Sequence, residues 1–287
     1  MDHARKTRMK FLLLAAVMAV LWQLAASSLP SGPEQDLAGH VRAAQQHRTA
    51  WRDRSGIGTP PDQDPHGCGL IGVEWSALTP TLGDHEAQRT ASDPAWAIRF
   101  GRWFEEAGLV EGDAVAIYSS ASFPGLLLSA LAAAEAGRLE PLLVVSLGAS
   151  SWGANRPDLS WPVLAQELRR AGYLSTRADF YTLGGDSETG GGMAPETIDA
   201  LRAAARDAGV PVLEASNLAE LVEIKTDLLV RHDARLLVSI GGSHANLGDD
   251  PEILELQPGL HAADQERQAG KGVIGRALAT GIPVLHV

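Results

Sequence analysis

Cysteine is almost absent from this chain of 287 residues, because Cys68 is the single one. An intramolecular disulfide is therefore excluded, and the fold must rest on a non-covalent core in which Cys68 is expected as a small buried residue. Methionine is also scarce, with four residues, which argues against a methionine-lined binding surface. Internal repeats and long low-complexity tracts are absent as well, so the composition is that of an ordinary globular protein.

The sequence signatures of common metal and nucleotide sites are also missing. The chain contains no H-E-x-x-H, no C-x-x-C and no Asp-rich loop, the patterns that most often place metal ligands together. It contains no G-x-x-x-x-G-K-[ST] and no G-x-G-x-x-G behind an expected strand. We therefore expect no metal site and no cofactor.

Basic residues are in the minority, with 24 Lys and Arg against 35 Asp and Glu and a formal net charge of −11. Four of the basic residues fall within residues 1–10, beside a single acidic one, so the rest of the chain is more acidic than the total suggests. Such a charge disfavours nucleic acid as a partner. An anionic ligand would have to be held by local groups, since the overall field repels it.

Long uncharged runs are absent except at the N-terminus, where Phe11–Leu29 carries no charge. About 20 apolar residues suffice to cross a bilayer. Basic residues precede this run and Glu34 and Asp36 follow it, which favours a cytoplasmic N-terminus. We expect residues 1–30 to form a membrane anchor, with residues 11–29 in the lipid bilayer. A cleaved signal peptide is the alternative, because "LAASS" offers small residues to a peptidase.

The remaining chain divides by composition into two parts. Residues 31–67 combine a polar helix over 34–54 with the Gly/Pro-rich linker "SGIGTPPDQDPHG" over 55–67. Residues 68–287 alternate apolar strands with amphipathic helices. Strands are expected at 69–75, 113–119, 141–147, 178–183, 210–215, 235–240 and 282–287, and helices at 93–108, 123–137, 160–172, 195–209, 217–232 and 265–281. This alternation predicts a doubly wound, mostly parallel, Rossmann-like α/β sheet with helices on both faces.

Ligands of open parallel sheets bind beyond the carboxyl ends of the strands, and five of the expected strands end there in small polar residues. We call these loops the carboxyl-end rim. Its candidate ligand-binding residues are Glu74, Ser76, Thr79, Thr81, Ser119, Ser120, Ser122, Ser150, Ser151, Trp152, Asn155, Gly184, Gly185, Gly242, Ser243, His244 and Asn246. Hydroxyls, amides and glycine backbones could hold a carboxylate or phosphate without lysine or arginine, and Arg89 is a further candidate anion partner. Helix caps and tight turns require the same residue types, so a purely structural role is the alternative.

One rim segment offers a candidate nucleophile. "GGSHA" over 241–245 loosely resembles the G-x-S-x-G elbow and contains Ser243. The following "NLGDDPEI" indicates a turn and not the helix that such an elbow requires. His244 is adjacent to Ser243 and poorly placed as its base, which leaves His232, His261 and His286 as possible bases. Whether the chain is an enzyme therefore stays open.

Taken together, the rim segments resemble the poly-gamma-glutamate system protein family, which is associated with synthesis of the poly-γ-glutamate capsule. The resemblance rests on "GVEWSALTPTLG", "SFPGLLLSALAAAEAG", "SLGASSWGANRPDLSW", "GGDSETGGGM", "SIGGSHANLG" and "GKGVIGRALATGIPVLH", and it covers most of the chain from residue 68 onward. The "GASSWGAN" block is the most distinctive of these stretches. The N-terminal anchor is also similar to what such proteins carry.

The resemblance implies a single-pass protein of the inner (cytoplasmic) membrane, with its C-terminal domain outside the cytoplasm. Its partners would be other membrane proteins of capsule synthesis and export, together with the polymer itself. The expected function is an accessory one, in which the carboxyl-end rim binds an anionic γ-glutamyl chain or a partner protein. The alternative is a serine-dependent hydrolase or transferase acting on γ-glutamyl bonds, with Ser243 or a serine of "SSASFPG" as the nucleophile.

Overall fold

The computed structural model describes residues 29–58, 62–263 and 270–287. The chain divides into two compact units, Met1–Asp36 and Leu37–Val287. The expected anchor over 11–29 lies, apart from Leu29, outside the described residues. Within the described ranges, no helix is long and apolar enough to cross a membrane.

The first described helix, α2 (Gly32–Arg54), begins at a reciprocal cap. The backbone N–H of Ser31 donates to the Glu34 carboxylate at 2.6 Å, and the Glu34 N–H donates back to the Ser31 hydroxyl at 3.4 Å. From Leu37 on, the helix belongs to the same compact unit as the sheet. Its buried Arg48 forms an ion pair with Glu167 and donates to the Asp158 carbonyl at 2.6 Å. The expected polar helix over 34–54 is therefore present, and its C-terminal half joins the core of the second unit.

The second unit is built on a six-stranded sheet in the order β3-β2-β1-β4-β6-β5. All strand pairs are parallel except β5–β6. The strands are β1 (Ala114–Ser120), β2 (Glu140–Ser146), β3 (Phe180–Thr182), β4 (Leu236–Ile240), β5 (Gly259–His261) and β6 (Val284–His286). The prediction of a mixed α/β fold with a mostly parallel sheet is confirmed.

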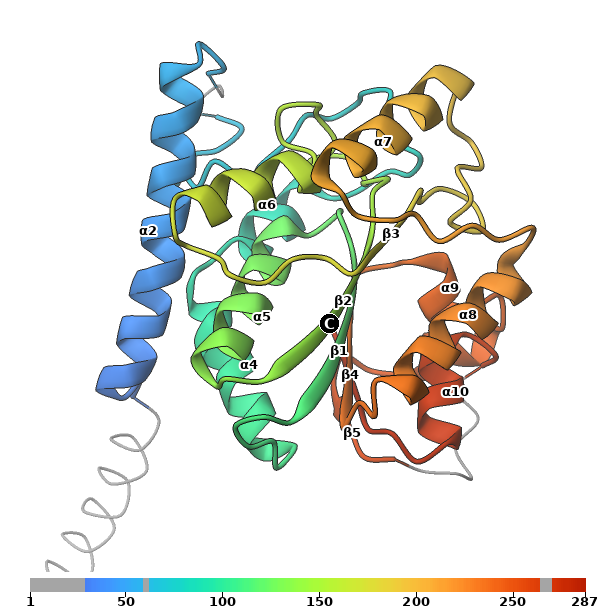
Figure 1. The fold of residues 1–287 in the computed structure, drawn as a ribbon. Coiled ribbons are helices and arrows are strands. Elements are labelled where there is room, and N and C mark those ends of the chain that lie inside the picture. The colour runs from blue at the N-terminus through green and yellow to red at the C-terminus, as the bar shows by residue number, and fades with distance from the viewer. Residues whose placement is uncertain (1–28, 59–61, 264–269) are drawn as a thin grey trace, which may run out of the picture. The chain divides into compact units, whose positions relative to one another are not determined.

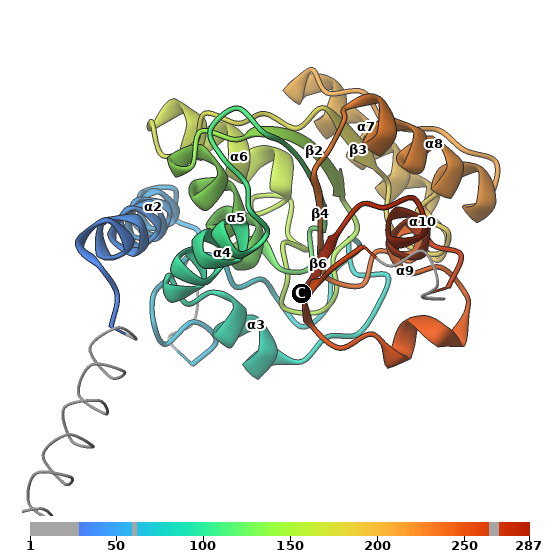
Figure 2. The same cartoon turned by 90° about the horizontal axis from the view of Figure 1, so that it is seen from below.

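Helices pack against the strands through two separate apolar clusters. Alternate residues of β1 take part in different clusters, Val115 and Ile117 in one and Ala116 and Tyr118 in the other, because successive side chains of a strand point to opposite faces. Figure 2 shows α4, α5 and α6 on one side of the strands and α8, α9 and α10 on the other. The helices are α3 (His85–Ala91), α4 (Ala95–Glu106), α5 (Pro124–Ala136), α6 (Trp161–Arg170), α7 (Pro195–Ala208), α8 (Leu218–Arg231), α9 (His244–Leu247) and α10 (Val273–Ala279), with a 3₁₀ turn at Pro251–Glu255 (Figure 1).

The strand expected over 69–75 is wrong. Leu70 and Ile71 are buried as their apolar character predicts, but the segment pairs with a loop and not with the sheet. The Gly72 N–H donates to the Trp152 carbonyl at 2.9 Å, and the Trp152 N–H donates to the Val73 carbonyl at 2.8 Å. Burial without sheet pairing produces the same apolar run as a buried strand, so the sequence pattern could not separate the two.

Other differences concern short elements. The segment 210–215 makes only an isolated bridge between Tyr181 and Val212, where a strand was expected. Helices α3 and α9 and strand β5 were not expected, and each has seven residues or fewer. The helix expected over 265–281 is described only as α10, since 264–269 lie outside the described residues. Elements this short carry too few residues for a periodic pattern.

Candidate functional site

The carboxyl ends of four parallel strands meet at one edge of the sheet. Ser120, Ser146 and Thr182 are register partners across β1, β2 and β3, so these strands end side by side. The loops beyond them are joined directly, because the N–H groups of Ala121, Leu147 and Gly148 donate to the carbonyls of Ser146, Thr182 and Leu183 at 2.8, 2.9 and 2.9 Å. The structure thus brings together loops that lie far apart in the sequence.

The segment 72–83 reaches this edge although no strand precedes it. The Ala149 N–H donates to the Leu78 carbonyl, and the Ser151 N–H to the Thr81 carbonyl, both at 3.1 Å. Asn155 fixes the segment from within, because its side-chain oxygen accepts from the Val73 N–H at 3.0 Å. Its amide nitrogen donates to the Val73 carbonyl at 2.7 Å and to the Thr79 hydroxyl at 2.9 Å. Asn155 is fully buried, so the carboxyl-end rim is braced by an internal side chain.

Most of the hydroxyls expected at the rim are engaged between loops. The Ser122 hydroxyl accepts from the Ser150 N–H of another loop at 3.0 Å. The Ser119 hydroxyl instead donates within β1, to the Ser120 carbonyl at 2.9 Å. Ser76 donates to the Asn155 carbonyl. These groups satisfy one another and hold the loops in register, which is the structural role that turns require of such residues.

Glycines of the rim serve close packing. Gly184 has a positive φ of 79°, and a β-carbon at this position would lie only 2.5 Å from the Gly148 backbone nitrogen, so a side chain there would collide with the neighbouring loop. Gly185 is equally confined by the carbonyl of Gly191. Gly242, in contrast, is exposed and meets no close neighbour apart from the distal carbon of Leu247.

Two rim hydroxyls remain unused. The Ser120 and Ser151 oxygens are buried and have no hydrogen-bond partner among the described residues. The segment 74–82 contributes exposed residues to the rim, because Glu74 and Thr81 are exposed and Trp75 and Leu82 are 64% and 82% exposed. Trp152 is half-buried at a φ of 65°, and its ring centre lies 4.5 Å from that of His85.

Within the rim, Ser243 lies in a buried cluster with Glu188 and Lys225. The sequence indicated Ser243 but neither of these two charged residues. The Lys225 ammonium on α8 is 3.3 Å from both a Glu188 carboxylate oxygen and the Ser243 hydroxyl. Ser243 donates to the same carboxylate, which also accepts from the Ala245 N–H at 2.8 Å. Thr182 donates to the second carboxylate oxygen at 2.6 Å. We call this the Glu188–Lys225–Ser243 cluster.

Burial sets the electrostatics of this cluster, since Glu188 and Lys225 are each only 2% exposed. Burial acts to raise the pKa of Glu188, but Lys225 and the hydrogen bonds from Ser243, Thr182 and Ala245 together bring that pKa below its usual value. Burial lowers the pKa of Lys225, against the opposing effect of Glu188. The carboxylate is therefore held ionised, and the ammonium loses its proton more readily than an exposed lysine does.

A serine hydroxyl beside a lysine amine is one arrangement that activates a serine nucleophile. Here the hydroxyl is bonded to Glu188, and Ser243 is buried, so a substrate does not reach it in this conformation. Helix α9 follows Ser243 directly, where a turn was expected. The described hydrogen bonds of Ser243 go to Glu188 and Lys225 and not to a histidine.

Among the described residues, no histidine considered as a base hydrogen-bonds to Ser243. His261 contacts the Gln257 carbonyl at 2.7 Å, whereas the buried Nδ1 of His286 has no described partner and His286 lines a cavity with Gly241 and Gly242. His244 accepts from the Ser187 N–H at 3.0 Å and pairs with Asp249 at 2.5 Å. His232 contacts the Glu140 carbonyl at 3.0 Å, at the start of β2 and hence at the opposite end of the strands. The burial of Lys225, which contacts Ser243, could have been predicted from the sequence. Lys225 falls between Leu221 and Leu229 on one buried face of α8. Glu188, in a glycine-rich loop, carried no comparable signal.

Asn246 stands apart from the cluster and supports the strands. Its amide nitrogen donates to the Tyr118 carbonyl at 3.2 Å and to the Ser239 hydroxyl at 3.1 Å, and the residue is fully buried. Within the described ranges, no three His, Cys, Asp or Glu side chains are grouped so that they could hold a metal ion.

Comparison with known proteins adds no relative: no family model matches the chain, and neither a curated protein nor a solved structure matches it.

Proposed function

We propose that this chain is a membrane-anchored accessory component of poly-γ-glutamate capsule synthesis or export. In this proposal residues 1–30 anchor the protein in the cytoplasmic membrane and a doubly wound, Rossmann-like domain lies outside it. The carboxyl-end rim binds the anionic γ-glutamyl chain, and other membrane proteins of capsule synthesis and export are its partners. The resemblance of the rim segments and the uncharged run Phe11–Leu29 support this proposal.

One observation carries the proposal. The stretches on which the resemblance rests include 72–83, 146–161, 184–193 and 239–248, and all four contribute to the carboxyl-end rim. They are cross-braced by hydrogen bonds into a fixed surface, and this is what a preorganised binding platform requires. Resemblance concentrated on one surface favours a role for that surface over a role in general stability.

The exposed part of the rim suits a γ-glutamyl chain in a particular way. Each γ-glutamyl unit has two side-chain methylenes in its main chain, and Trp75 and Leu82 offer apolar surface on which such groups can pack. The pendant carboxylates would then be held by hydrogen-bond donors, since the acidic body of the protein gives no general attraction. Binding of this kind is expected to be specific for the γ linkage.

The test is isothermal titration of the full chain in detergent micelles with γ-linked glutamate decamer, with an α-linked decamer as reference. We expect heat from the γ-linked decamer alone, and a loss of about tenfold in affinity for Trp75→Ala, since truncating a contacting aromatic costs about 1.4 kcal/mol or more. Val110→Ala is the matched control, because Val110 is equally exposed but precedes the amino end of β1. Equal binding of both decamers, or no binding by a folded chain, contradicts the proposal.

A second candidate function is supported by the distance of 3.3 Å between the Ser243 hydroxyl and the Lys225 amine. It is a serine-dependent hydrolase or transferase of γ-glutamyl bonds, with Lys225 in the place where a histidine was expected. A fluorophosphonate probe should then label the wild-type chain and the Ser216→Ala control, whose serine is exposed, but not Ser243→Ala. Absence of labelling across neutral and alkaline pH removes this candidate.

A further inference from the structure

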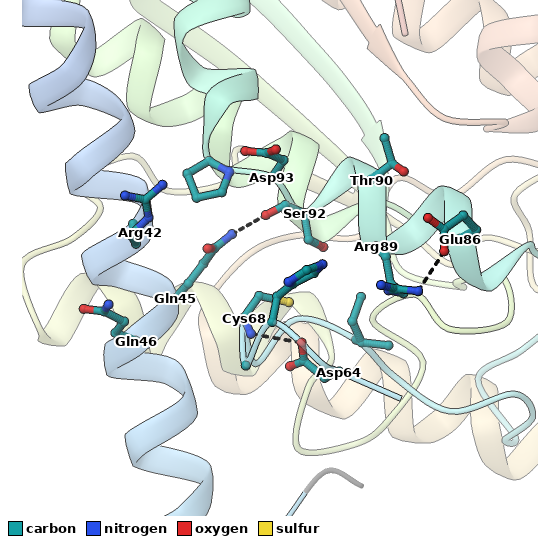
Figure 3. Close-up of a pocket in the computed structure, with 14 residues that line it drawn as sticks. Arg42, Gln45, Gln46, Asp64, Cys68, Glu86, Arg89, Thr90, Ser92 and Asp93 are labelled. Carbon is teal, nitrogen blue, oxygen red and sulfur yellow. Dashed lines mark hydrogen bonds and ion pairs between the residues drawn. The ribbon is translucent and has the colours of Figure 1, made fainter. Parts of the chain in front are cut away.

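A cavity lies beside α2, and its lining includes no residue of the Glu188–Lys225–Ser243 cluster. It has a volume of about 510 Å³ and is bounded by α2, the segment 64–71, α3 and the residues that lead into α4. Figure 3 shows side chains from α2 on one side, side chains from α3 on the other, and Cys68 between them. We call it the α2 cavity. Its volume is within the range of small-molecule sites, about 300–1,000 Å³.

The cationic groups of the α2 cavity have unused hydrogen-bond donors. Arg89 is paired with Glu86 through one terminal nitrogen at 2.8 Å, but its Nε is buried and has no partner in the described part of the chain. Arg42 forms no hydrogen bond or ion pair with any other described residue. A guanidinium with free donors recognises a carboxylate well, because its planar fork matches the two oxygens.

The carboxylates of the α2 cavity differ in how far they are committed. Asp64 accepts from the Cys68 and Gly69 N–H groups at 3.0 and 2.7 Å, one on each oxygen, so it shapes the wall. Asp93 uses one oxygen for the Ala95 N–H at 2.8 Å. Asp93 lines the same cavity as Arg42, and no ion pair joins the two among the described residues. Opposite charges that share a cavity unpaired leave room for a ligand that carries both signs.

We propose that the α2 cavity binds a small zwitterionic amino acid. Arg89 and Arg42 supply hydrogen-bond donors for its carboxylate, and Asp93 supplies an acceptor for its ammonium group. Gln46 and His66 add further polar groups to the cavity wall. Because the wall carries charges of both signs, we expect a zwitterion to bind better than a simple anion or a simple cation. The site is one of binding and not of thiol chemistry, because burial raises the pKa of the Cys68 thiol to about 12.

This inference is independent of the proposed function, since the exposed rim residues Trp75 and Leu82 do not line the α2 cavity. The two can therefore fail separately. Arg42→Ala should leave binding of the γ-linked decamer unchanged, and Trp75→Ala should leave binding of the amino acid unchanged.

The experiment screens the common L-amino acids against the full chain in detergent micelles by thermal shift, followed by titration calorimetry of the best binder. That amino acid is then compared with its N-acetyl derivative, which lacks the positive charge, and its carboxamide, which lacks the negative one. We expect each derivative to bind at least about tenfold more weakly, because each loses a charge-assisted hydrogen bond of about 1.5–3 kcal/mol.

The variants complete the test. Arg42→Ala should weaken binding by about tenfold without unfolding the chain, because Arg42 is exposed and has no described partner. Arg138→Ala is the matched control. Arg138 is an exposed arginine that precedes β2, pairs with Glu111 and does not line the α2 cavity. No binding by any amino acid at millimolar concentration overturns the proposal. So does undiminished binding of either derivative, which would mark the site as one for a single charge.

Discussion

At the scale of single residues, the side chains with the largest energetic consequence are those buried with a charge. Lys225 and Glu188 join α8 to the loop after β3, and both lie where water cannot replace a lost partner. A buried charge without its partner is far more costly than either the pair or two neutral groups. The ion pair therefore holds the glycine-rich loop 184–192 in its position against α8.

The buried Glu188–Lys225 ion pair predicts how single and double variants differ in stability. Lys225→Met should lower the free energy of unfolding by about 3–5 kcal/mol, because Glu188 is left buried without its ion-pair partner. The double variant Glu188→Gln/Lys225→Met should recover most of that loss, since no charge then remains. Urea unfolding followed by circular dichroism measures both.

Lys271→Met is the control for this prediction, because the Lys271 side chain is 88% exposed and lies 3.6 Å from Asp250. Its effect should stay within about 0.5 kcal/mol. If the double variant is as unstable as Lys225→Met, the loss comes from packing and not from the unpaired charge.

At the scale of elements, the carboxyl-end rim is held by loops that brace one another. Segment 72–83 has no strand of its own, and the loop 148–155 supplies its backbone partners. The buried Asn155 side chain bonds both the backbone of Val73 and the Thr79 hydroxyl. This amide thus adds a buried side-chain support, between Val73 and Thr79, to the backbone pairing of the segment.

Replacing that amide should therefore loosen the rim locally. Asn155→Ala is expected to cost about 3 kcal/mol, because three buried hydrogen bonds are lost. Hydrogen exchange should accelerate at the amides of Val73 and Ser76 while the strands stay protected.

Asn217→Ala offers a contrast, since Asn217 caps α8 and accepts from the Glu220 N–H at 3.0 Å. It should cost about 1 kcal/mol and affect only the first turn of that helix. Uniform acceleration of exchange in Asn155→Ala, across strands and rim alike, would show that the amide supports the whole fold.

At the scale of the whole molecule, alternation of apolar strands with amphipathic helices was enough to predict the class of fold. It also placed the ends of β1, β2, β3 and β4 at a common edge, because parallel strands joined by helices must run the same way. The alternation failed at 69–75, where backbone pairing with a loop mimics a strand. It failed for β5 because three residues establish no period.

The candidate sites were less predictable than the fold, for a physical reason. Rim hydroxyls could be located from strand ends, but whether each one faces solvent or another loop depends on tertiary packing. Pairing of Lys225 with Glu188 joins residues 37 positions apart through a loop of unusual backbone, which no periodicity encodes. The α2 cavity arises only when α2 packs beside segment 64–71, which local sequence patterns do not report.

The state of Cys68 has a practical consequence for labelling this protein with thiol-specific probes. A thiol that is buried and stays protonated at neutral pH reacts slowly with maleimides. The native chain therefore behaves as a cysteine-free background, into which single reporter thiols can be introduced without first removing Cys68. Labelling of such reporters on intact cells would test directly whether the domain lies outside the cytoplasmic membrane, as proposed.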